Sequence, residues 1–282
     1  MGAKRHLLYA FYRLLKKAGY FERLNYSSDK GNILLFHRVA THRENSLTTP
    51  ALLFEELMRE IRSNFNPTPL QDVTERIKNG KRLDPKTVVI TFDDDYKDTF
   101  LNAVPVLLRY NIPATFFITS GYINSDKIYP WNGEKKSRYP LMDWEDVKEL
   151  VRLGFEIGAH TINHHSLAKI PLFTAREEII RSKGEIENKI QKEVNAFAYP
   201  FGRKDSITAE VLQIVKEAGY KCCCSAYGGK VTEQSDPYNL FRICEYPHLI
   251  EFLMELDNFM TYFDGKMSLN ILGYTIANFG GK

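Results

Sequence analysis

Cysteines are few and long hydrophobic runs are absent from this sequence of 282 residues. Three of the four cysteines are consecutive, Cys222 to Cys224, and the fourth is Cys244, so the sequence holds neither a disulfide framework nor a CxxC metal site. Every apolar run is much shorter than the roughly 18 residues of a membrane-spanning helix, and the N-terminus lacks the apolar core of a signal peptide. We therefore expect a cytoplasmic protein.

The sequence also lacks a phosphate-binding glycine motif and a strong net charge. No G-x-G-x-x-G or P-loop follows any candidate strand. A net charge of +3 is too small to indicate a nucleic-acid partner. With 44% hydrophobic and 26% charged residues, the chain can bury the core of one α/β domain or of two smaller ones. No repeat or low-complexity linker divides it, which favours a single domain.

Positive charge is concentrated at the N-terminus. Residues 1–25 hold six Lys or Arg against Glu22, a net charge of +5, and since the whole chain carries +3, the remainder carries −2. Apolar side chains recur there at helical spacing, at Leu7, Phe11, Leu14, Leu15 and Ala18. The pattern predicts a basic amphipathic helix over residues 4–18, which rests either on the inner face of an anionic membrane or on the side of the domain.

Past residue 30, short apolar runs alternate with helical patterns such as ALLFEELMREIR and DTFLNAVPVLLRY. Seven runs are predicted to be buried strands: 33–36, 87–92, 114–118, 155–159, 195–199, 220–227 and 240–244. This alternation predicts a parallel α/β sheet, and about seven strands over this length fit a barrel better than a doubly wound sheet. We expect an N-terminal basic segment over 1–29, the barrel over 30–250 and a C-terminal helical extension over 251–282.

Reactive side chains follow several of these strands at their carboxyl ends. They are Asp93, Asp94 and Asp95 after 87–92, His160 with His164 and His165 after 155–159, and His37 after 33–36. The active sites of parallel α/β barrels lie at that rim, so these side chains would gather in one cleft. One carboxylate and two imidazoles can hold a Zn²⁺-like ion and leave room for water, while a second carboxylate serves as a base.

Each of these motifs has a structural alternative when it is taken alone. Consecutive aspartates after a strand often cap the next helix. The H-x-x-x-H spacing of His160 and His164 is common by chance, and a histidine at the end of a strand, such as His37, is commonly structural. The metal-site interpretation therefore depends on the conjunction of the motifs.

Three motifs resemble those of the polysaccharide deacetylase (NodB-homology) family of carbohydrate esterases: TFDDDY at 91–96, GAHTINHHSL at 158–167 and FAYPFG at 197–202. The resemblance covers roughly residues 30–245 and implies a distorted (β/α)7-type barrel in a single domain. It implies Asp93 as the base and Asp94, His160 and His164 as metal ligands, with His165 as an alternative third ligand. The implied cofactor is one divalent ion, zinc, with cobalt and nickel as alternatives.

The remaining catalytic groups depart from the usual pattern of this family. Its general acid is a histidine in an L-x-H motif near the C-terminus, whereas here Leu35, Phe36 and His37 supply that motif near the N-terminus. The chain thereby resembles the circularly permuted branch of poly-N-acetylglucosamine deacetylases, which implies His37 as the acid. Ala198 stands where many relatives have an arginine that orients the base, so Arg242 is a candidate substitute. By analogy, the Phe201 N–H would stabilise the oxyanion.

Asp95 is a further departure, because the family usually has glycine there. Aspartate tolerates the left-handed backbone conformation better than most residues, so the turn can survive.

The resemblance implies a metal-dependent deacetylase that removes the N-acetyl group from an amino sugar in a free, polymeric or lipid-linked saccharide. Two alternatives remain, a metal hydrolase of a non-sugar amide and a non-catalytic saccharide-binding protein on the same scaffold. The expected partners are a saccharide and, through residues 4–18, the membrane surface. Five aromatic residues are suited to stacking on sugar rings: Tyr129, Trp131, Tyr139, Trp144 and Tyr199.

Overall fold

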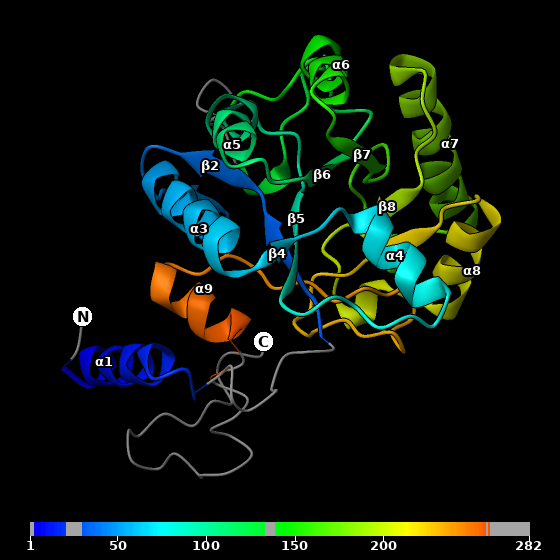
Figure 1. The fold of residues 1–282 in the computed structure, drawn as a ribbon. Helices are drawn as coiled ribbons and strands as arrows, with labels where there is room; N and C mark the ends of the chain where they lie inside the picture. Colours follow the sequence, from blue (N-terminus) through cyan, green and yellow to red (C-terminus); the bar gives the residue numbers. More distant parts are fainter. Residues whose placement is uncertain (1–2, 21–29, 133–138, 258, 260–282) are drawn as a thin grey trace.

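A parallel sheet occupies the centre of the protein in a computed structural model, which describes residues 3–20, 30–132, 139–257 and 259 (Figure 1). Six strands follow one another across this sheet: β1 (Asn32–Phe36), β5 (Thr87–Phe92), β6 (Ala114–Ile118), β7 (Glu156–Ala159), β8 (Ala196–Ala198) and β9 (Cys222–Cys224). The short strand β4 (Asn66–Pro67) also pairs with β5. A separate two-stranded sheet joins β2 (Arg38–Ala40) to β3 (Thr48–Pro50).

The sheet curls into a distorted barrel, which confirms the predicted fold class. The prediction of a regular strand at 240–244 is wrong, yet this segment joins the two edges of the sheet. Leu240 bridges Cys224 of β9, and Ile243 bridges Leu34 of β1, both in parallel. The segment meets each neighbour at a single bridge, which is too little pairing for a regular ladder, and the barrel is irregular at this seam.

Side chains of the strands alternate between the interior of the barrel and the surrounding helices. Ile33, Val89 and Phe117 belong to the interior cluster, together with Leu70 of helix α4 (Leu70–Lys78). The interior is tight at Gly158, where an added Cβ would lie 2.4 Å from Cδ1 of Phe117. Gln71 of α4 and Glu156, the first residue of β7, line one cavity. Helix α4 therefore covers the amino ends of the strands and leaves the carboxyl ends for a site.

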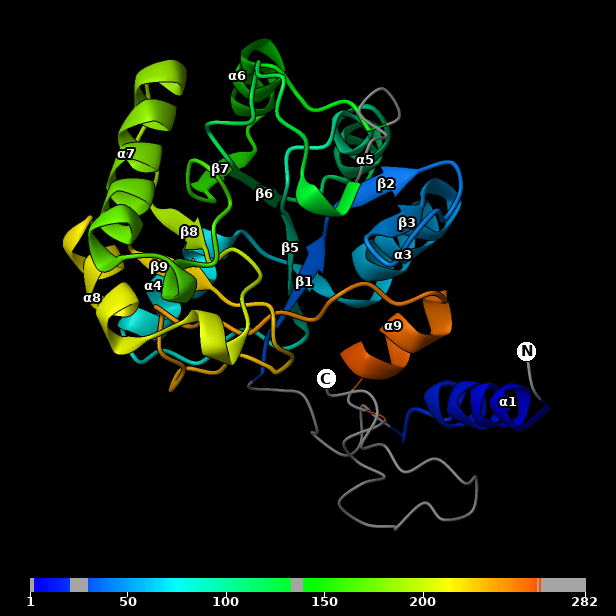
Figure 2. The same ribbon diagram turned by 180° about the vertical axis from the view of Figure 1, so that it is seen from behind.

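Five helices surround the sheet: α3 (Ala51–Asn64), α5 (Lys97–Tyr110), α6 (Trp144–Arg152), α7 (Leu172–Ile190) and α8 (Ala209–Glu217) (Figures 1 and 2). Their buried residues recur at helical spacing, as Phe54, Leu57, Met58 and Ile61 do on α3. The Phe54 ring packs edge-on against Phe36 of β1, with the ring centroids 5.3 Å apart. The outward side chains of the strands and the buried helix faces thus form the main core.

The predicted N-terminal helix forms as α1 (Ala3–Lys17) and lies beside α9 (Leu249–Leu256), outside the barrel (Figures 1 and 2). Its buried face is formed by Tyr9 and Tyr12, which cluster with Ile250 and Met254; of the predicted apolar stripe, Leu15 packs against this cluster, whereas Leu7 and Leu14 are exposed. The Tyr12 hydroxyl also contacts the carboxylate of Asp257. The packed face of α1 is therefore formed by tyrosines, whose hydroxyls reach polar partners.

The C-terminal extension begins close to its predicted boundary. Helix α9 begins at Leu249, two residues before the expected start of the C-terminal extension, and residues 260–282 of that extension lie outside the described residues. Within the described part of the chain, no helix is both long and apolar enough to span a membrane.

Candidate active site

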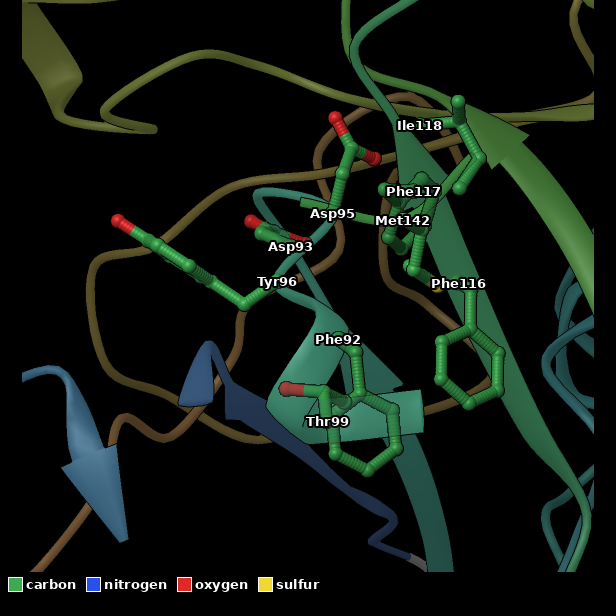
Figure 3. A pocket seen from close by; sticks show the side chains of 9 residues that line it. All are labelled: Phe92, Asp93, Asp95, Tyr96, Thr99, Phe116, Phe117, Ile118 and Met142. Carbon is green, nitrogen blue, oxygen red and sulfur yellow. The ribbon is translucent and has the colours of Figure 1, made fainter. Parts of the chain in front are cut away.

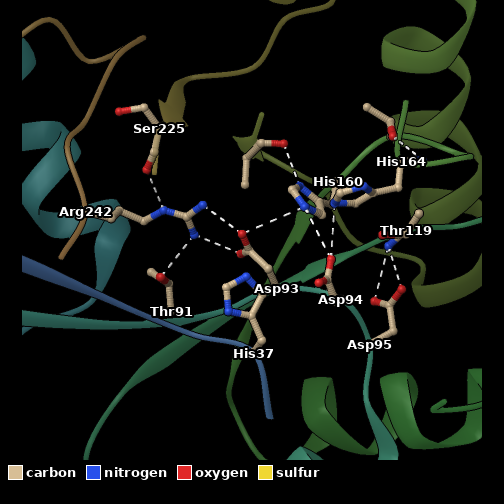
Figure 4. A network of polar contacts seen from close by, with 12 residues as sticks. His37, Thr91, Asp93, Asp94, Asp95, Thr119, His160, His164, Ser225 and Arg242 are labelled. Carbon is tan, nitrogen blue, oxygen red and sulfur yellow. Dashed lines mark hydrogen bonds and ion pairs between the residues drawn. The ribbon is translucent and has the colours of Figure 1, made fainter. Parts of the chain in front are cut away.

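Three consecutive aspartates follow β5, and the backbone turns sharply where they begin. Asp93 continues the pairing of β5 with β1, since its N–H donates to the Phe36 carbonyl at 2.9 Å. Asp94 and Asp95 have left-handed backbone conformations, with φ of 73° and 51°, which aspartate tolerates better than most residues. The turn directs the three carboxylates differently: Asp93 toward Arg242, Asp94 toward two histidines and Asp95 toward Thr119 (Figure 4).

Arg242 holds the Asp93 carboxylate with two hydrogen bonds. Its Nη1 and Nη2 lie 2.8 and 2.7 Å from the two oxygens, and Nε donates to the Ser225 carbonyl at 2.8 Å (Figure 4). The guanidinium is fully buried, and such bidentate pairs are strong and directional. Burial alone would raise the pKa of Asp93, but the charge and hydrogen bonds of Arg242, with smaller effects from His160 and His37, together outweigh burial and lower it to about 2. Asp93 is therefore ionised at neutral pH.

Asp94, His160 and His164 form a buried cluster whose ligand atoms lie within 4.8 Å of one another. Asp94 Oδ1 is 3.2 Å from Nε2 of His164 and 3.7 Å from Nε2 of His160. His160 Nδ1 lies 2.7 Å from the Ala198 carbonyl, which fixes the proton on Nδ1 and leaves Nε2 as the free lone pair. Burial lowers the pKa of His160 to about 4 despite the nearby Asp93, so this imidazole is neutral.

This cluster fits a divalent metal ion. Burial would raise the pKa of Asp94, but His164 counteracts it and the pKa is lowered, so Asp94 offers a carboxylate. Among the described residues, Asp94 Oδ1 is a buried oxygen that accepts no regular hydrogen bond. A buried carboxylate with an unsatisfied oxygen beside two imidazoles is a donor set that can bind a divalent metal ion.

The neighbouring histidines His164 and His165 point in different directions. His164 has a left-handed conformation with φ of 55°, and its N–H donates to the Thr161 hydroxyl at 3.0 Å. The side chain of His165 is 49% exposed, and its Nδ1 lies 3.8 Å from Oε1 of Glu178. The structure thus brings His164, and not His165, to Asp94.

His37 lies at the carboxyl end of β1 and is paired with a residue that the sequence reasoning missed. Its Nδ1 and its backbone N–H lie 2.7 and 2.9 Å from Oε1 of Glu245. Burial would lower the pKa of His37, but the charge and hydrogen bond of Glu245, with smaller effects from Asp94 and Asp93, together outweigh burial and raise it to about 9. His37 is therefore a cation at neutral pH. Glu245 directly follows the predicted strand 240–244. A search for polar residues at the carboxyl ends of predicted strands, which identified the other site residues, could therefore have identified Glu245 too.

The His164 ring packs edge-on against the rings of Trp131, Phe201 and Tyr129. The rings of Trp131 and Phe201 each lie 4.9 Å from the His164 ring, edge-on, and 6.0 Å from each other. Phe201 is 45% exposed, and Trp131 is partly buried. Of the other predicted stacking residues, Tyr129, Tyr139 and Tyr199 are buried core residues, and Trp144 begins α6. Tyr129 also lies beside the site, with its ring 5.5 Å from the His164 ring, but it is fully buried, whereas Trp131 keeps some exposed surface there.

The protein is closely packed on the inner side of the aspartates. Figure 3 shows Asp93 and Asp95 beside side chains of β5 and β6 and Met142, and the space that these residues line is too small for a water molecule (about 0 Å³). Burial raises the pKa of Asp95 well above its usual range, although the Thr119 N–H donates to this carboxyl at 3.0 Å. A substrate must therefore approach from the rim, where His164 and Phe201 lie.

Comparison with known proteins places these residues in a family context. The family model described as polysaccharide deacetylase matches residues 80–223, about half of the chain. The Bacillus subtilis protein YxkH, named as a polysaccharide deacetylase, is 27% identical over 212 residues, which cover 75% of this chain and 70% of that protein. The poly-β-1,6-N-acetyl-D-glucosamine N-deacetylase of Staphylococcus aureus is 29% identical over 187 residues, or 62% of this chain and 60% of that protein.

Solved structures show the same fold at lower sequence identity. IcaB from Ammonifex degensii superposes with a TM-score of 0.70 at 20% identity, covering 82% of this chain and 98% of that chain. The Streptococcus pyogenes deacetylase PplD, solved in complex with acetate, gives 0.69 at 23% identity, covering 80% and 97%. At these identities the likeness concerns the fold.

Proposed function

The chain belongs to the polysaccharide deacetylase family, and from this premise we propose that it hydrolyses the N-acetyl group of an amino sugar within a saccharide. The observation that carries the proposal is the joint presence of three groups at one rim: the Asp94, His160 and His164 cluster, the ionised Asp93 and the protonated His37. Poly-β-1,6-N-acetylglucosamine is the first substrate to test, because the staphylococcal relative is named for it.

Asp94, His160 and His164 would hold one divalent ion, with zinc favoured by the mixed nitrogen and oxygen donors. When bound, such an ion polarises a carbonyl and lowers the pKa of water toward neutrality. The buried Ala198 carbonyl keeps His160 in the tautomer that a metal ligand needs.

Asp93 acts as the base in this proposal. It is ionised at neutral pH, and the two hydrogen bonds from Arg242 fix both of its oxygens. It therefore takes a proton from the attacking water in a fixed direction, at the cost of a lower basicity. Oriented proton transfer of this kind contributes roughly 10²- to 10⁴-fold to rates.

His37 acts as the acid. Water adds to the acetyl carbon, the carbon–nitrogen bond breaks, and the His37 proton passes to the leaving nitrogen, which gives acetate and a free amino sugar. The pairing with Glu245 keeps that proton available at neutral pH. The Phe201 N–H remains the proposed donor to the oxyanion, and the left-handed conformation of Phe201, with φ of 62°, places this residue next to His164.

The test is release of acetate and free amine from poly-β-1,6-N-acetylglucosamine oligomers by the zinc-loaded protein, with metal content measured on the same preparation. We expect one ion per chain, loss of activity after chelation and recovery when zinc is added back. His164→Ala should lose the ion, and His165→Ala is the matched control that should keep it.

The possible outcomes separate the alternatives. Binding of oligomers without release of acetate would favour a saccharide-binding protein. Turnover of simple acetylamides but of no acetylated sugar would favour a hydrolase of non-sugar amides. Loss of the ion from His165→Ala and not from His164→Ala would contradict the ligand assignment.

We also propose that α1 contacts an anionic membrane surface on the cytoplasmic side. Leu7, Phe11 and Leu14 recur at helical spacing and are 67%, 43% and 68% exposed, while Tyr9 and Tyr12 hold the opposite face against α9. Exposed basic residues, Arg13 and Lys17, lie on the same helix. An exposed apolar face with adjacent positive charge is typical of helices that lie in the membrane interface.

Cosedimentation with phosphatidylserine-containing vesicles tests this contact. Binding should weaken at high salt, because screening acts over about 10 Å at 0.1 M. Leu7→Glu with Leu14→Glu should abolish binding, whereas Leu52→Glu, at an exposed position on α3, should not. If the Leu7 and Leu14 variant bound the vesicles as well as the Leu52 variant does, the proposed membrane contact would be wrong.

A further inference from the structure

The loop that carries His164 has an unusual backbone. Thr161 and His164 both have left-handed conformations, with φ of 67° and 55°, and neither is a glycine. The two residues between them direct their N–H groups at one carboxylate, since the N–H groups of Ile162 and Asn163 lie 2.9 and 2.8 Å from Oε2 of Glu178. Successive N–H groups in such a turn form a concave site for an anion, and here the anion is the protein's own side chain.

Glu178 lies outside this loop and accepts its hydrogen bonds from a neighbouring helix. It belongs to α7, is only 4% exposed, and its second oxygen accepts a hydrogen bond from Asn163 Nδ2 at 2.6 Å. Burying a carboxylate is costly unless its oxygens are hydrogen-bonded, and three N–H donors meet that need. Glu178 therefore ties the loop to a long helix that packs on the barrel.

The carbonyl side of the same loop is also held. Ser120 N–H donates to the Thr161 carbonyl at 3.1 Å, and Gly121 N–H donates to the Ile162 carbonyl at 3.0 Å. Gly121 must be a glycine for this approach, because an added Cβ would lie 2.6 Å from the Ile162 oxygen. The loop is thus held on both sides. Residues 120–121 bind its carbonyl groups, and Glu178 of α7 binds its N–H groups.

The two histidine ligands differ in how their rings are fixed. His160 is held directly through Nδ1 by the Ala198 carbonyl. His164 Nδ1 is buried and has no hydrogen-bond partner among the residues that the structure describes. The direction of this ring therefore depends on its backbone and on packing against Trp131, Phe201 and Tyr129. A change in the loop backbone would therefore move the His164 lone pair relative to Asp94.

From these contacts we infer that Glu178 is a positioning residue that aims His164 and thereby sets the affinity of the site for its metal ion. The inference rests on the metal-dependent function proposed above. Residues that orient metal ligands from outside the coordination shell typically change metal affinity by roughly 10- to 100-fold when they are replaced.

The test measures the Zn²⁺ dissociation constant of the full-length protein by competition with a chromophoric chelator. Glu178→Ala should raise the constant by roughly 10- to 100-fold. Glu178→Gln should raise it less, since its amide oxygen can replace Oε2 as the acceptor for both backbone N–H groups. Glu177→Gln removes the same charge one residue earlier on α7, and its dissociation constant should equal that of the wild type.

Melting temperatures with and without zinc distinguish positioning from a purely structural role. A positioning role predicts that zinc stabilises Glu178→Gln less than it stabilises the wild type. Unchanged zinc affinity in both Glu178 variants, with only a lower melting temperature of the metal-free protein, would overturn the inference and leave the proposed function intact. Absence of zinc binding in the wild type would instead overturn the proposed function itself.

Discussion

Replacing Glu245 by glutamine removes the charge that contacts His37 while keeping the size of the side chain. Oε1 of Glu245 lies 2.7 Å from Nδ1 of His37, and their pairing is the main reason that the pKa of His37 is raised to about 9. Glutamine can still accept a hydrogen bond, but it carries no charge to favour the imidazolium. We therefore expect the pKa of His37 to fall to its ordinary value of about 6.5 or below, because burial then acts with less opposition.

The size of the effect follows from the two pKa values. The difference between about 9 and 6.5 corresponds to roughly 3 to 4 kcal/mol of preference for the protonated imidazole, at roughly 1.4 kcal/mol per pKa unit. At pH 7.5, a group with a pKa of about 9 is roughly 97% protonated, and one with a pKa of 6.5 is roughly 9% protonated. The variant should therefore lose roughly tenfold in kcat at pH 7.5 and little at pH 5.5.

The assay is the pH dependence of kcat for acetate release, measured on wild type, Glu245→Gln, His37→Ala and the double variant with equal metal content. The alkaline limb should move from near pH 9 to near or below pH 6.5 in Glu245→Gln. His37→Ala should lack this limb, and adding Glu245→Gln to it should change the profile no further. An unmoved alkaline limb in Glu245→Gln, with a uniform loss of activity, would refute the reasoning.

Stability gives an independent check with a defined sign. Because the pKa of His37 is raised in the folded protein, its stabilising contribution is fully present below pH 6.5 and is lost as the pH rises through about 9. Urea unfolding of the wild type should show this loss between those values, and Glu245→Gln should not.

Three further predictions concern the other side chains of the site. Asp93→Asn should lower kcat by roughly 10²- to 10⁴-fold without loss of metal, and full activity in this variant would exclude Asp93 as the base. Arg242→Lys should raise the pKa of Asp93 above about 2, since one ammonium cannot replace two guanidinium hydrogen bonds, so the acidic limb of kcat should move to higher pH; an unchanged limb would contradict this account. Trp131→Ala should raise KM for oligosaccharides by roughly tenfold, through loss of an aromatic contact near His164, and should leave KM for a small acetamide unchanged; an equal change for both substrates would indicate a structural role instead.

Much of the fold could be predicted because it depends on local patterns. The strands at 87–92 and 114–118 have the predicted bounds, since continuous apolar runs of this length are buried on both faces of a parallel sheet. The segment 240–244 had a similar pattern and formed no regular strand. Pairing depends on the position of two neighbouring edges, which a run of residues does not specify.

Some residues of the site could be predicted from local patterns, and others could not. The rule that polar residues at the carboxyl ends of parallel strands converge brought Asp93, Asp94, His160 and His37 together from the sequence. Glu178 follows no strand, and it reaches the site only because α7 packs back along the barrel. Its role has no local signature, since its partners are backbone N–H groups of a distant loop.

The sequence by itself determined which residue types stand at the carboxyl ends of the strands, because strand length and burial are encoded by neighbouring side chains. Only the tertiary structure decided where those side chains point. Left-handed backbone turns direct Asp94 and His164 toward each other, and leave His165 half exposed. Likewise, α1 has the predicted helical period, but Tyr9 and Tyr12 form its buried face because they pack against α9. A periodic pattern fixes the spacing of side chains along an element, whereas their direction in space depends on backbone angles and on the surfaces that long-range packing brings near.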